Sequence, residues 1–256
     1  MKKLVLAASF FVIGSASALA ADLPARTYTK APPIVQPVYN WTGCYIGIEG
    51  GGNWGHGRSV GDGLNNGVPT AAPAGTLKAS TDVSGGVVGG TIGCNYQVNN
   101  WVVGIEGDGS WFGSTGTSAT LAPFNSAFNE SLSNNWLATV RGRAGFLARN
   151  DLLLFGTAGG AFTNLRINEL DPATGNGAIE SHQLAGWTAG VGAEWYFAPS
   201  WSAKFEYLYV DFGNKNYFAF TPTGCCTLQT THLTDNLVRV GVNYHFNWAG
   251  PVVAKY

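Results

Sequence analysis

The sequence predicts an all-β fold, in which eight antiparallel strands close into a barrel that spans a membrane. Segments of alternating apolar and polar residues recur through 41–246, short and long breaks alternate between them, and aromatic residues recur on one face. Only 11% of the 256 residues are charged, against roughly 25% in an average globular protein. The net charge of -1 gives no reason to expect nucleic-acid binding.

The first 20 residues are typical of a signal peptide. A positive start, "MKK", precedes an apolar run over 4–14, and "ALA" at 18–20 matches a small-x-small cleavage site. A spanning helix would need about 20 apolar residues, and this run is shorter. We therefore expect an exported mature chain. Residues 21–40 are rich in Pro and lack periodicity, which predicts an extended periplasmic tether.

Eight strand-like segments follow the tether, and each alternates two unlike kinds of residue. The last, "LVRVGVNYHF" at 237–246, puts Val, Tyr and Phe on one face and Arg, Gly, Asn and His on the other. In a soluble β-sandwich the apolar face would pack inward, whereas in a membrane barrel it meets lipid. The predicted strands are Thr42–His56, Asp82–Val98, Trp101–Thr115, Leu132–Ala148, Leu152–Leu165, Ala185–Ala198, Trp201–Gly213 and Asp235–Phe246.

The breaks between these strands alternate in length. Short breaks lie at 99–100, 149–151 and 199–200, and long ones at 57–81, 116–131, 166–184 and 214–234. Outer-membrane barrels have short periplasmic turns and long extracellular loops. A soluble sandwich offers no reason to sort its loops in this way, so the pattern favours the barrel.

Aromatic residues ten positions apart share a face in three of the strands. Ten residues at about 3.3 Å each, tilted by about 40°, rise roughly 25 Å, which is the height of the lipid-facing apolar band. Each pair would thus place one ring at each membrane interface. The pairs are Trp101 with Trp111, Trp136 with Phe146, and Trp187 with Phe197.

If these aromatic faces meet lipid, the same parity sends the charged residues into the lumen. Side chains fill the interior of an eight-stranded barrel, and unpaired buried charges are costly. We therefore expect an ion-pair network that plugs the lumen, with a selective pore as the alternative. The inward set comprises five acids, Glu49, Glu106, Asp108, Glu194 and Glu206, and four bases, Arg141, Arg143, Lys204 and Arg239.

Five segments resemble the small outer-membrane β-barrel family of outer-membrane immunogenic and opacity-like proteins, often named porin family. They are "YNWTGCYIGIEGGGNWG" (39–55), "NNWLATVRGRAGF" (134–146), "LLFGTAGGAF" (153–162), "WSAKFEYLYVDFG" (201–213) and "VRVGVNYHF" (238–246). The resemblance implies a barrel in a Gram-negative outer membrane, among lipids and lipopolysaccharide, inserted by the barrel-assembly machinery. Members of this family are mostly surface antigens and envelope components, and some are weak porins or ligand binders.

The last strand is similar to the assembly signal of outer-membrane barrels. That signal has a polar residue, a Gly two positions later, and then two alternating apolar residues, the last of them aromatic. Arg239, Gly241, Tyr244 and Phe246 fit this order. The chain continues through a tail at 247–256, whose Pro makes it a poor ninth strand. We expect Phe246 to end the signal, with Tyr256 as the alternative.

Cysteines predict one disulfide and leave a second question open. The first two strands flank a loop centred near residue 69, so Cys44 and Cys94 should lie opposite each other on the outward face, within disulfide reach. The family usually has an aromatic residue at position 44. Cys225 and Cys226 are adjacent in the last long loop, where a vicinal disulfide, two thiols or bonds to other chains all remain open.

Sequence motifs do not point to catalysis, a cofactor or a metal. "GIEGGGNWGHG" (47–57) lacks the Lys-Ser/Thr of a phosphate loop, and His182 and His232 lie in predicted loops without an evident nucleophile. We expect a non-enzymatic, surface-exposed envelope protein. The alternatives are a narrow porin, loop-mediated ligand binding or adhesion with possible host or phage contacts, and a lipid-modifying enzyme.

Overall fold

The computed structural model describes residues 39–65, 68–219 and 226–246. The predicted signal peptide, most of the tether, and the tail at 247–256 lie outside these residues. Along the described part of the chain, no helix has the length and hydropathy needed to cross a membrane.

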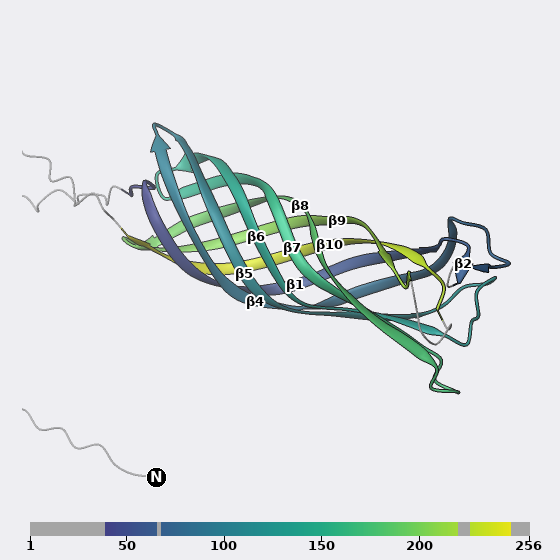
Figure 1. The fold of residues 1–256 in the computed structure, drawn as a ribbon. Coiled ribbons are helices and arrows are strands. Elements are labelled where there is room, and N and C mark those ends of the chain that lie inside the picture. The colour runs from purple at the N-terminus through teal and green to yellow at the C-terminus, as the bar shows by residue number, and fades with distance from the viewer. Residues whose placement is uncertain (1–38, 66–67, 220–225, 247–256) are drawn as a thin grey trace, which may run out of the picture. The chain divides into compact units, whose positions relative to one another are not determined.

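Eight long antiparallel strands form a closed ring in the order β1-β10-β9-β8-β7-β6-β5-β4 (Figure 1). This confirms the predicted all-β barrel. A two-stranded hairpin, β2 (Leu64–Asn65) with β3 (Val68–Pro69), lies between β1 and β4. The barrel strands are β1 (Gly43–Gly61), β4 (Thr76–Val98), β5 (Trp101–Ala119), β6 (Asn129–Arg149), β7 (Leu152–Leu170), β8 (Gly177–Ala198), β9 (Trp201–Tyr217) and β10 (Gln229–Phe246).

The strands extend further at the end of the long loops than the sequence predicted. The predicted loops at 57–81, 116–131, 166–184 and 214–234 were too long, because each neighbouring strand continues for several residues beyond the predicted boundary. Hydrogen-bonded pairing continues through these added residues, which are rich in Ser, Thr and Asn. The strands are already held in register in the half nearer the short turns, so the same register carries on. The short turns lie where they were predicted, between β4 and β5, β6 and β7, and β8 and β9.

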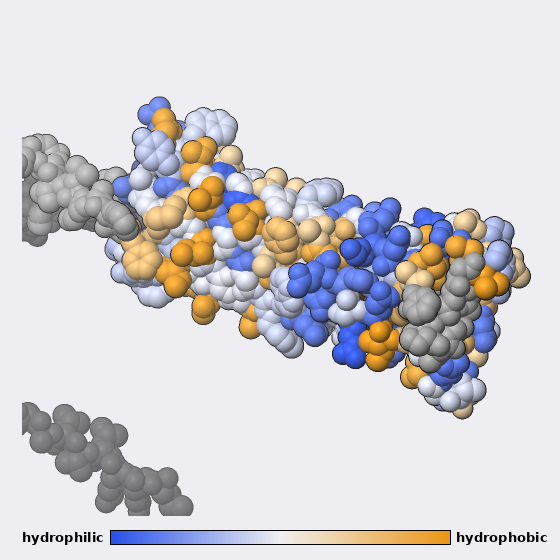
Figure 2. Space-filling model, viewed as in Figure 1, coloured by the Kyte–Doolittle hydropathy of each residue, from blue (hydrophilic) through white to orange (hydrophobic). Residues whose placement is uncertain are grey.

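The outer surface of the barrel changes character along its axis. Large apolar side chains face outward over the half nearer the short turns, and polar residues such as His56, Asp82 and Arg166 follow nearer the long loops. Figure 2 shows this as mostly apolar and pale atoms that give way to hydrophilic ones towards the long-loop end. The apolar half is therefore the part that spans the membrane.

The apolar core lies inside the barrel. It begins at the end of the membrane-spanning half that is nearer the long loops and continues beyond it. Seven of the eight long strands, all but β1, contribute inward-facing side chains to the core, and residues that follow β9 add to them. Its members include Val83, Val87, Phe112, Leu132, Leu137, Leu165, Ile167, Leu184, Leu208, Val210, Phe212, Tyr217, Phe218, Leu233 and Leu237.

A second, smaller cluster closes the end with the short turns. Trp41 is fully buried, although it precedes β1, and its indole N–H donates to the backbone oxygen of Asn150 at 3.1 Å. Its ring packs against Tyr196, and Tyr39 stacks on the same tyrosine. Tyr39, at the end of the predicted tether, and Trp41, just after it, therefore plug the periplasmic mouth of the barrel.

Candidate functional site

The candidate site is the charged lumen of the membrane-spanning half. All nine charged residues that the parity of the sequence placed inside are buried there, each with at most 7% of its surface exposed. They come from β1, β5, β6, β8, β9 and β10. The strand pairing brings the acids of one strand beside the bases of the next, as in Glu106 opposite Arg141 and Glu206 opposite Arg239.

Two arginines in the middle of the lumen share the same carboxylates. Arg141 donates to Glu206 at 2.6 Å, to Glu106 at 2.7 Å and to Asp108 at 3.0 Å. Arg239 donates to Asp108 and Glu206, both at 2.6 Å, and also to Glu49. Charge-assisted bonds of this kind order both partners, so the two guanidinium groups tie five strands, β1, β5, β6, β9 and β10, together across the barrel.

Lys204 and Arg143 extend the network in two directions. The Lys204 ammonium lies 3.1 Å from Glu106 and 3.4 Å from Glu49, which gives the centre a third cation. Arg143 lies nearer the periplasmic end, where it pairs with Glu194 and stacks at 4.0 Å over the ring of Phe155. A guanidinium that is stacked and ion-paired is held in one orientation.

Sequence reasoning missed several uncharged partners of this network. Tyr45 donates its hydroxyl hydrogen to Glu106 and accepts a bond of 2.9 Å from Arg143. Its ring fits because position 93 on the neighbouring strand is Gly, where a Cβ would lie 2.4 Å from the Tyr45 oxygen. Tyr45 shares the parity of Glu49, so the alternation of β1 could have identified it.

A buried polar group lies at the periplasmic end of the network and consists of Ser202, His245 and Glu194. Ser202 donates to Glu194 at 2.6 Å and lies 2.9 Å from His245, and Glu194 lies 3.3 Å from the same ring nitrogen, Nε2. A catalytic triad needs the acid on the other ring nitrogen, Nδ1, so that it can orient the base. All three side chains are buried, so the geometry does not match that arrangement.

A second polar cluster, which we call the outer cap, lies in the lumen at the long-loop end. Lys78 pairs with Glu169 at 2.7 Å, and both are buried. Glu130 accepts bonds of 2.7 Å from Ser59 and from Gln229. The apolar core therefore has a charged layer on either side of it.

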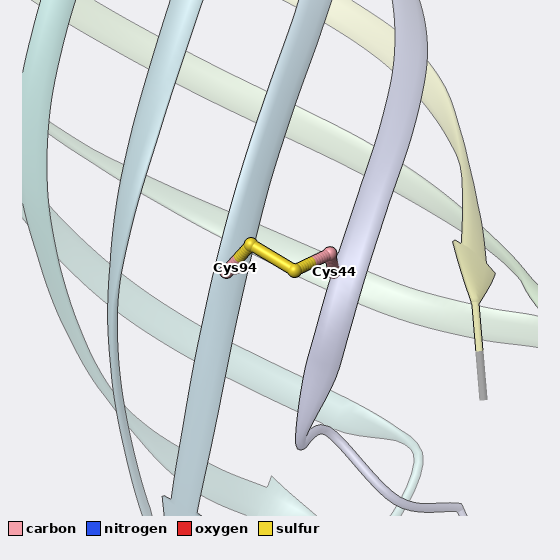
Figure 3. The surroundings of a disulfide bond; sticks show 2 residues. All are labelled: Cys44 and Cys94. Atoms are coloured by element: carbon pink, nitrogen blue, oxygen red, sulfur yellow. A yellow bond between two sulfur atoms is a disulfide. The ribbon is translucent and has the colours of Figure 1, made fainter. Parts of the chain in front are cut away.

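The structure contains the Cys44–Cys94 disulfide that the strand register predicts (Figure 3), and the two residues are directly opposed in β1 and β4. Cys94 faces outward and Cys44 is half-buried. Cys226 is buried in the apolar core and is not a free thiol, whereas Cys225 lies outside the described residues.

The predicted interface aromatics and the aromatic residues that end the final strand face outward. Trp101, Trp111, Trp136, Phe146, Trp187 and Phe197 are all exposed. Trp101 is paired with Phe146 and Trp111 with Trp136 across β5 and β6, at opposite ends of the apolar band. Tyr244 and Phe246 are also exposed, Arg239 points inward, and Phe246 is the last residue of β10.

Comparison with known proteins agrees with this architecture. The family described as the outer membrane protein β-barrel domain matches residues 6–246. The chain belongs to this family. It is 33% identical over 253 residues to the 31 kDa outer-membrane immunogenic protein of Brucella melitensis, covering 95% of this chain and 100% of that protein.

Further relatives support the same assignment. The 25 kDa outer-membrane immunogenic protein of Brucella abortus is 27% identical, with 96% of this chain and 99% of that protein covered. The crystal structure of the outer membrane protein OprG from Pseudomonas aeruginosa is similar in fold, with a TM-score of 0.51 and 12% identity over 82% of this chain and 100% of OprG. The protein is therefore a β-barrel of the outer membrane that reaches the cell surface.

Proposed function

We propose that the protein is a closed, non-catalytic barrel that displays its outer rim as an antigen-like contact surface of the envelope. The observation that carries the proposal is the filled lumen. From the periplasm outward, the aromatic plug at Trp41, the ion-pair network, the apolar core and the outer cap follow one another, and all are built from buried side chains. A packed charge network followed by a dry apolar layer is unfavourable for a hydrated solute.

The narrow-porin alternative has less support. A conducting pore needs a continuous wet path, and the guanidinium groups of Arg141 and Arg239 occupy the centre of the lumen at hydrogen-bonding distance from carboxylates on both sides. Because their positions depend on mutual pairing, the network acts as a plug that also fixes the shape of the barrel.

Non-enzymatic function is supported by the position of the polar groups. The group formed by Ser202, His245 and Glu194 is buried at the periplasmic end of the network, and both Ser202 and Glu194 contact the same imidazole nitrogen, Nε2. A substrate would have to pass the apolar core or the aromatic plug to reach this group. The names of the Brucella relatives describe immunogenic outer-membrane proteins, which fits a role carried by the exposed rim.

Recording from planar bilayers tests the closed lumen. The wild-type barrel should give no discrete conductance steps. Replacement of Arg141 and Arg143 by Met removes two of the guanidinium groups from the plug, so that barrel should be less stable in urea and should flicker open if it still inserts. Stable, ion-selective steps from the wild-type protein would overturn the proposal. Arg166→Met, on the outer surface, is the matched control.

A further inference from the structure

The ring of strands has an open seam above the membrane between β8 and β9. The pairing of these strands runs from Ala198 with Trp201 up to Trp187 with Asp211, and stops there. Beyond that point β8 stays paired with β7 as far as Gly177, and β9 stays paired with β10 as far as Tyr217. Figure 1 shows the tip of the β7–β8 hairpin diverging from the other strands. Residues 177–186 therefore form a sheet edge that no described strand covers.

A β-bulge in β9 separates this strand from β8 and so creates the seam. The register between β10 and β9 shifts between His232 and Thr234, opposite the segment that holds Gly213, whose φ of +65° is in the left-handed region. The Asp211 carboxylate accepts the backbone N–H of Gly213 at 2.7 Å and lies 3.0 Å from His232. These contacts turn β9 away from β8 while both strands continue, so the seam is a built feature rather than a frayed end.

Side chains hold the two sides of the seam at a set distance. The carboxylate of Glu180 accepts a hydrogen bond from the backbone of Phe218, and the ring of His182 meets Tyr217 edge-on with centroids 4.9 Å apart. Both side chains lie on the inward face of β8. They keep the hairpin in place and leave the backbone groups of the edge without a partner among the strands that the structure describes.

The edge carries little of the usual protection against pairing with another chain. Natural edges carry Lys, Pro, a bulge or inward-pointing charges, or are very short. Glu180 and His182 do point inward, but they are already engaged with Phe218 and Tyr217. Here the segment "GAIESHQLAG" has neither Lys nor Pro, and at about 3.3 Å per residue it extends roughly 30 Å. Alternate residues direct their backbone N–H and C=O groups toward β7. The backbone groups of the remaining residues therefore point into the seam.

We propose that residues 177–186 of β8 bind an extended segment of a protein outside the cell by strand addition, with an acidic side chain placed opposite Ser181. This deepens the proposed surface role, because it rests on the outer rim being the contact surface. Strand addition takes its affinity from the main chain and its specificity from the neighbouring side chains.

The acidic preference follows from Arg166. Arg166 of β7 is paired with Ser181 of β8 and is exposed on the outward face. Since Ser181 is small, the longer Arg166 side chain can lean across it toward the strand that would lie on the far side of β8. Ile179 and Gln183 flank Ser181 on the same face, which favours a partner strand that alternates the acid with apolar or hydroxyl residues.

A second copy of the chain fits this edge poorly. Two copies inserted in one membrane direct their β8 strands the same way. A two-fold axis along the membrane normal therefore cannot bring the two edges into antiparallel register. An extended segment that arrives from outside can adopt either direction.

Hydrogen–deuterium exchange on the full-length mature barrel in micelles tests the first half of the proposal. In the free protein, the amides of 177–186 that face the seam should exchange quickly, while those that face β7 should be protected. Protection of both sets, whether constant or rising with protein concentration, would show that the edge is already covered and would overturn the proposal.

A synthetic probe tests the second half. The peptide Thr-Val-Thr-Asp-Thr-Val-Thr, at millimolar concentration, should protect the amides that face the seam, and its fully N-methylated form should not. A form with a central Lys should bind about fivefold more weakly. Arg166→Glu should reverse that preference, whereas Arg58→Glu, which changes an exposed cation on β1 away from the seam, should leave it unchanged. Absence of protection, or protection indifferent to both the central charge and Arg166, would overturn the proposal. Neither result would affect the conductance test of the closed lumen.

Discussion

The membrane half of the barrel and its extracellular half have opposite interiors. In the membrane half the wall presents side chains such as Ile48, Trp101 and Val240 to lipid, and the lumen holds ion pairs. In the extracellular half the wall presents Arg166, Ser181 and similar residues to water, and the lumen holds the apolar core. The change occurs near the outer row of aromatic residues, over only a few positions in each strand.

The difference shows that the solvent outside each part determines what that part packs inside. Lipid offers apolar side chains as good an environment as a core does, so burial drives little packing within the membrane and polar pairing supplies the internal contacts. Above the membrane, removal of apolar area from water again favours an apolar interior. A single set of strands therefore contains two kinds of core.

The largest expected effect comes from breaking the membrane-half core. Arg239→Met removes a cation that Glu49, Asp108 and Glu206 share, which leaves the remaining cations too few to compensate the buried carboxylates. We expect a loss of about 3–5 kcal/mol in the free energy of unfolding. Urea titration in micelles, followed by tryptophan fluorescence, measures it. Arg58→Met, an exposed position on β1, should change stability by less than about 0.5 kcal/mol; equal effects would mean that the pairs contribute no net stability.

Truncation in the extracellular half should act through the apolar core. Leu132 is 1% exposed, and Leu132→Ala should cost about 2–4 kcal/mol through lost burial and the cavity left behind. The matched change on the lipid face, Val240→Ala, should cost less than about 1 kcal/mol, because that side chain packs against acyl chains. The same urea titration compares the two variants, and similar losses would remove the distinction between the two halves.

The sequence was sufficient to predict the lipid face of the membrane half and the charged residues of its lumen. One alternation with aromatics at its ends identifies both the lipid face and the inward charges, and the register predicts the pairing of Cys44 with Cys94. The outer cap was missed where bulges break that parity. An extra residue in β4 turns Lys78 inward, and an irregularity between Asn134 and Leu137 in β6 does the same for Glu130. Parity continues without a break in β7, so Glu169 was within reach of the same reasoning.

The plug and the seam needed three-dimensional information. Trp41 precedes the first strand and has no periodic neighbours, so nothing local indicates that it folds into the periplasmic mouth. The open edge of β8 depends on Gly213 and Asp211 in another strand. The local sequence at 177–186 shows only that the edge lacks Lys and Pro, which commonly protect one.

The outer cap should respond less than the central network to loss of a cation. Lys78→Met leaves Glu169 without its partner at 2.7 Å. The cap borders the extracellular rim, where water can reach the freed carboxylate after a small rearrangement, so we expect a loss of about 2 kcal/mol. The double variant with Glu169→Gln should recover part of it. A loss equal to that of Arg239→Met would show that the cap is as dry as the membrane half.

The smallest expected effect is a local pH response at the tip of the β7–β8 hairpin. Asp171 accepts the Thr174 hydroxyl at 2.7 Å and the Ala173 amide at 2.9 Å, and these bonds hold the pKa of its carboxyl below the ordinary value for an aspartate. Because the pKa is lowered on folding, the stabilisation is present above the ordinary aspartate pKa. It is lost as the pH falls through the lowered one.

Acidification through that range should therefore increase exchange of the Ala173 amide beyond its intrinsic pH dependence, with no change in the urea midpoint of the whole barrel. Asp171→Asn keeps an acceptor for the Ala173 amide but does not titrate, so in that variant the protection should be independent of pH. A shift of the global midpoint over the same pH range, abolished by Asp171→Asn, would instead couple the hairpin tip to the barrel core. The extracellular half could then no longer be treated as a region where surface contacts act locally.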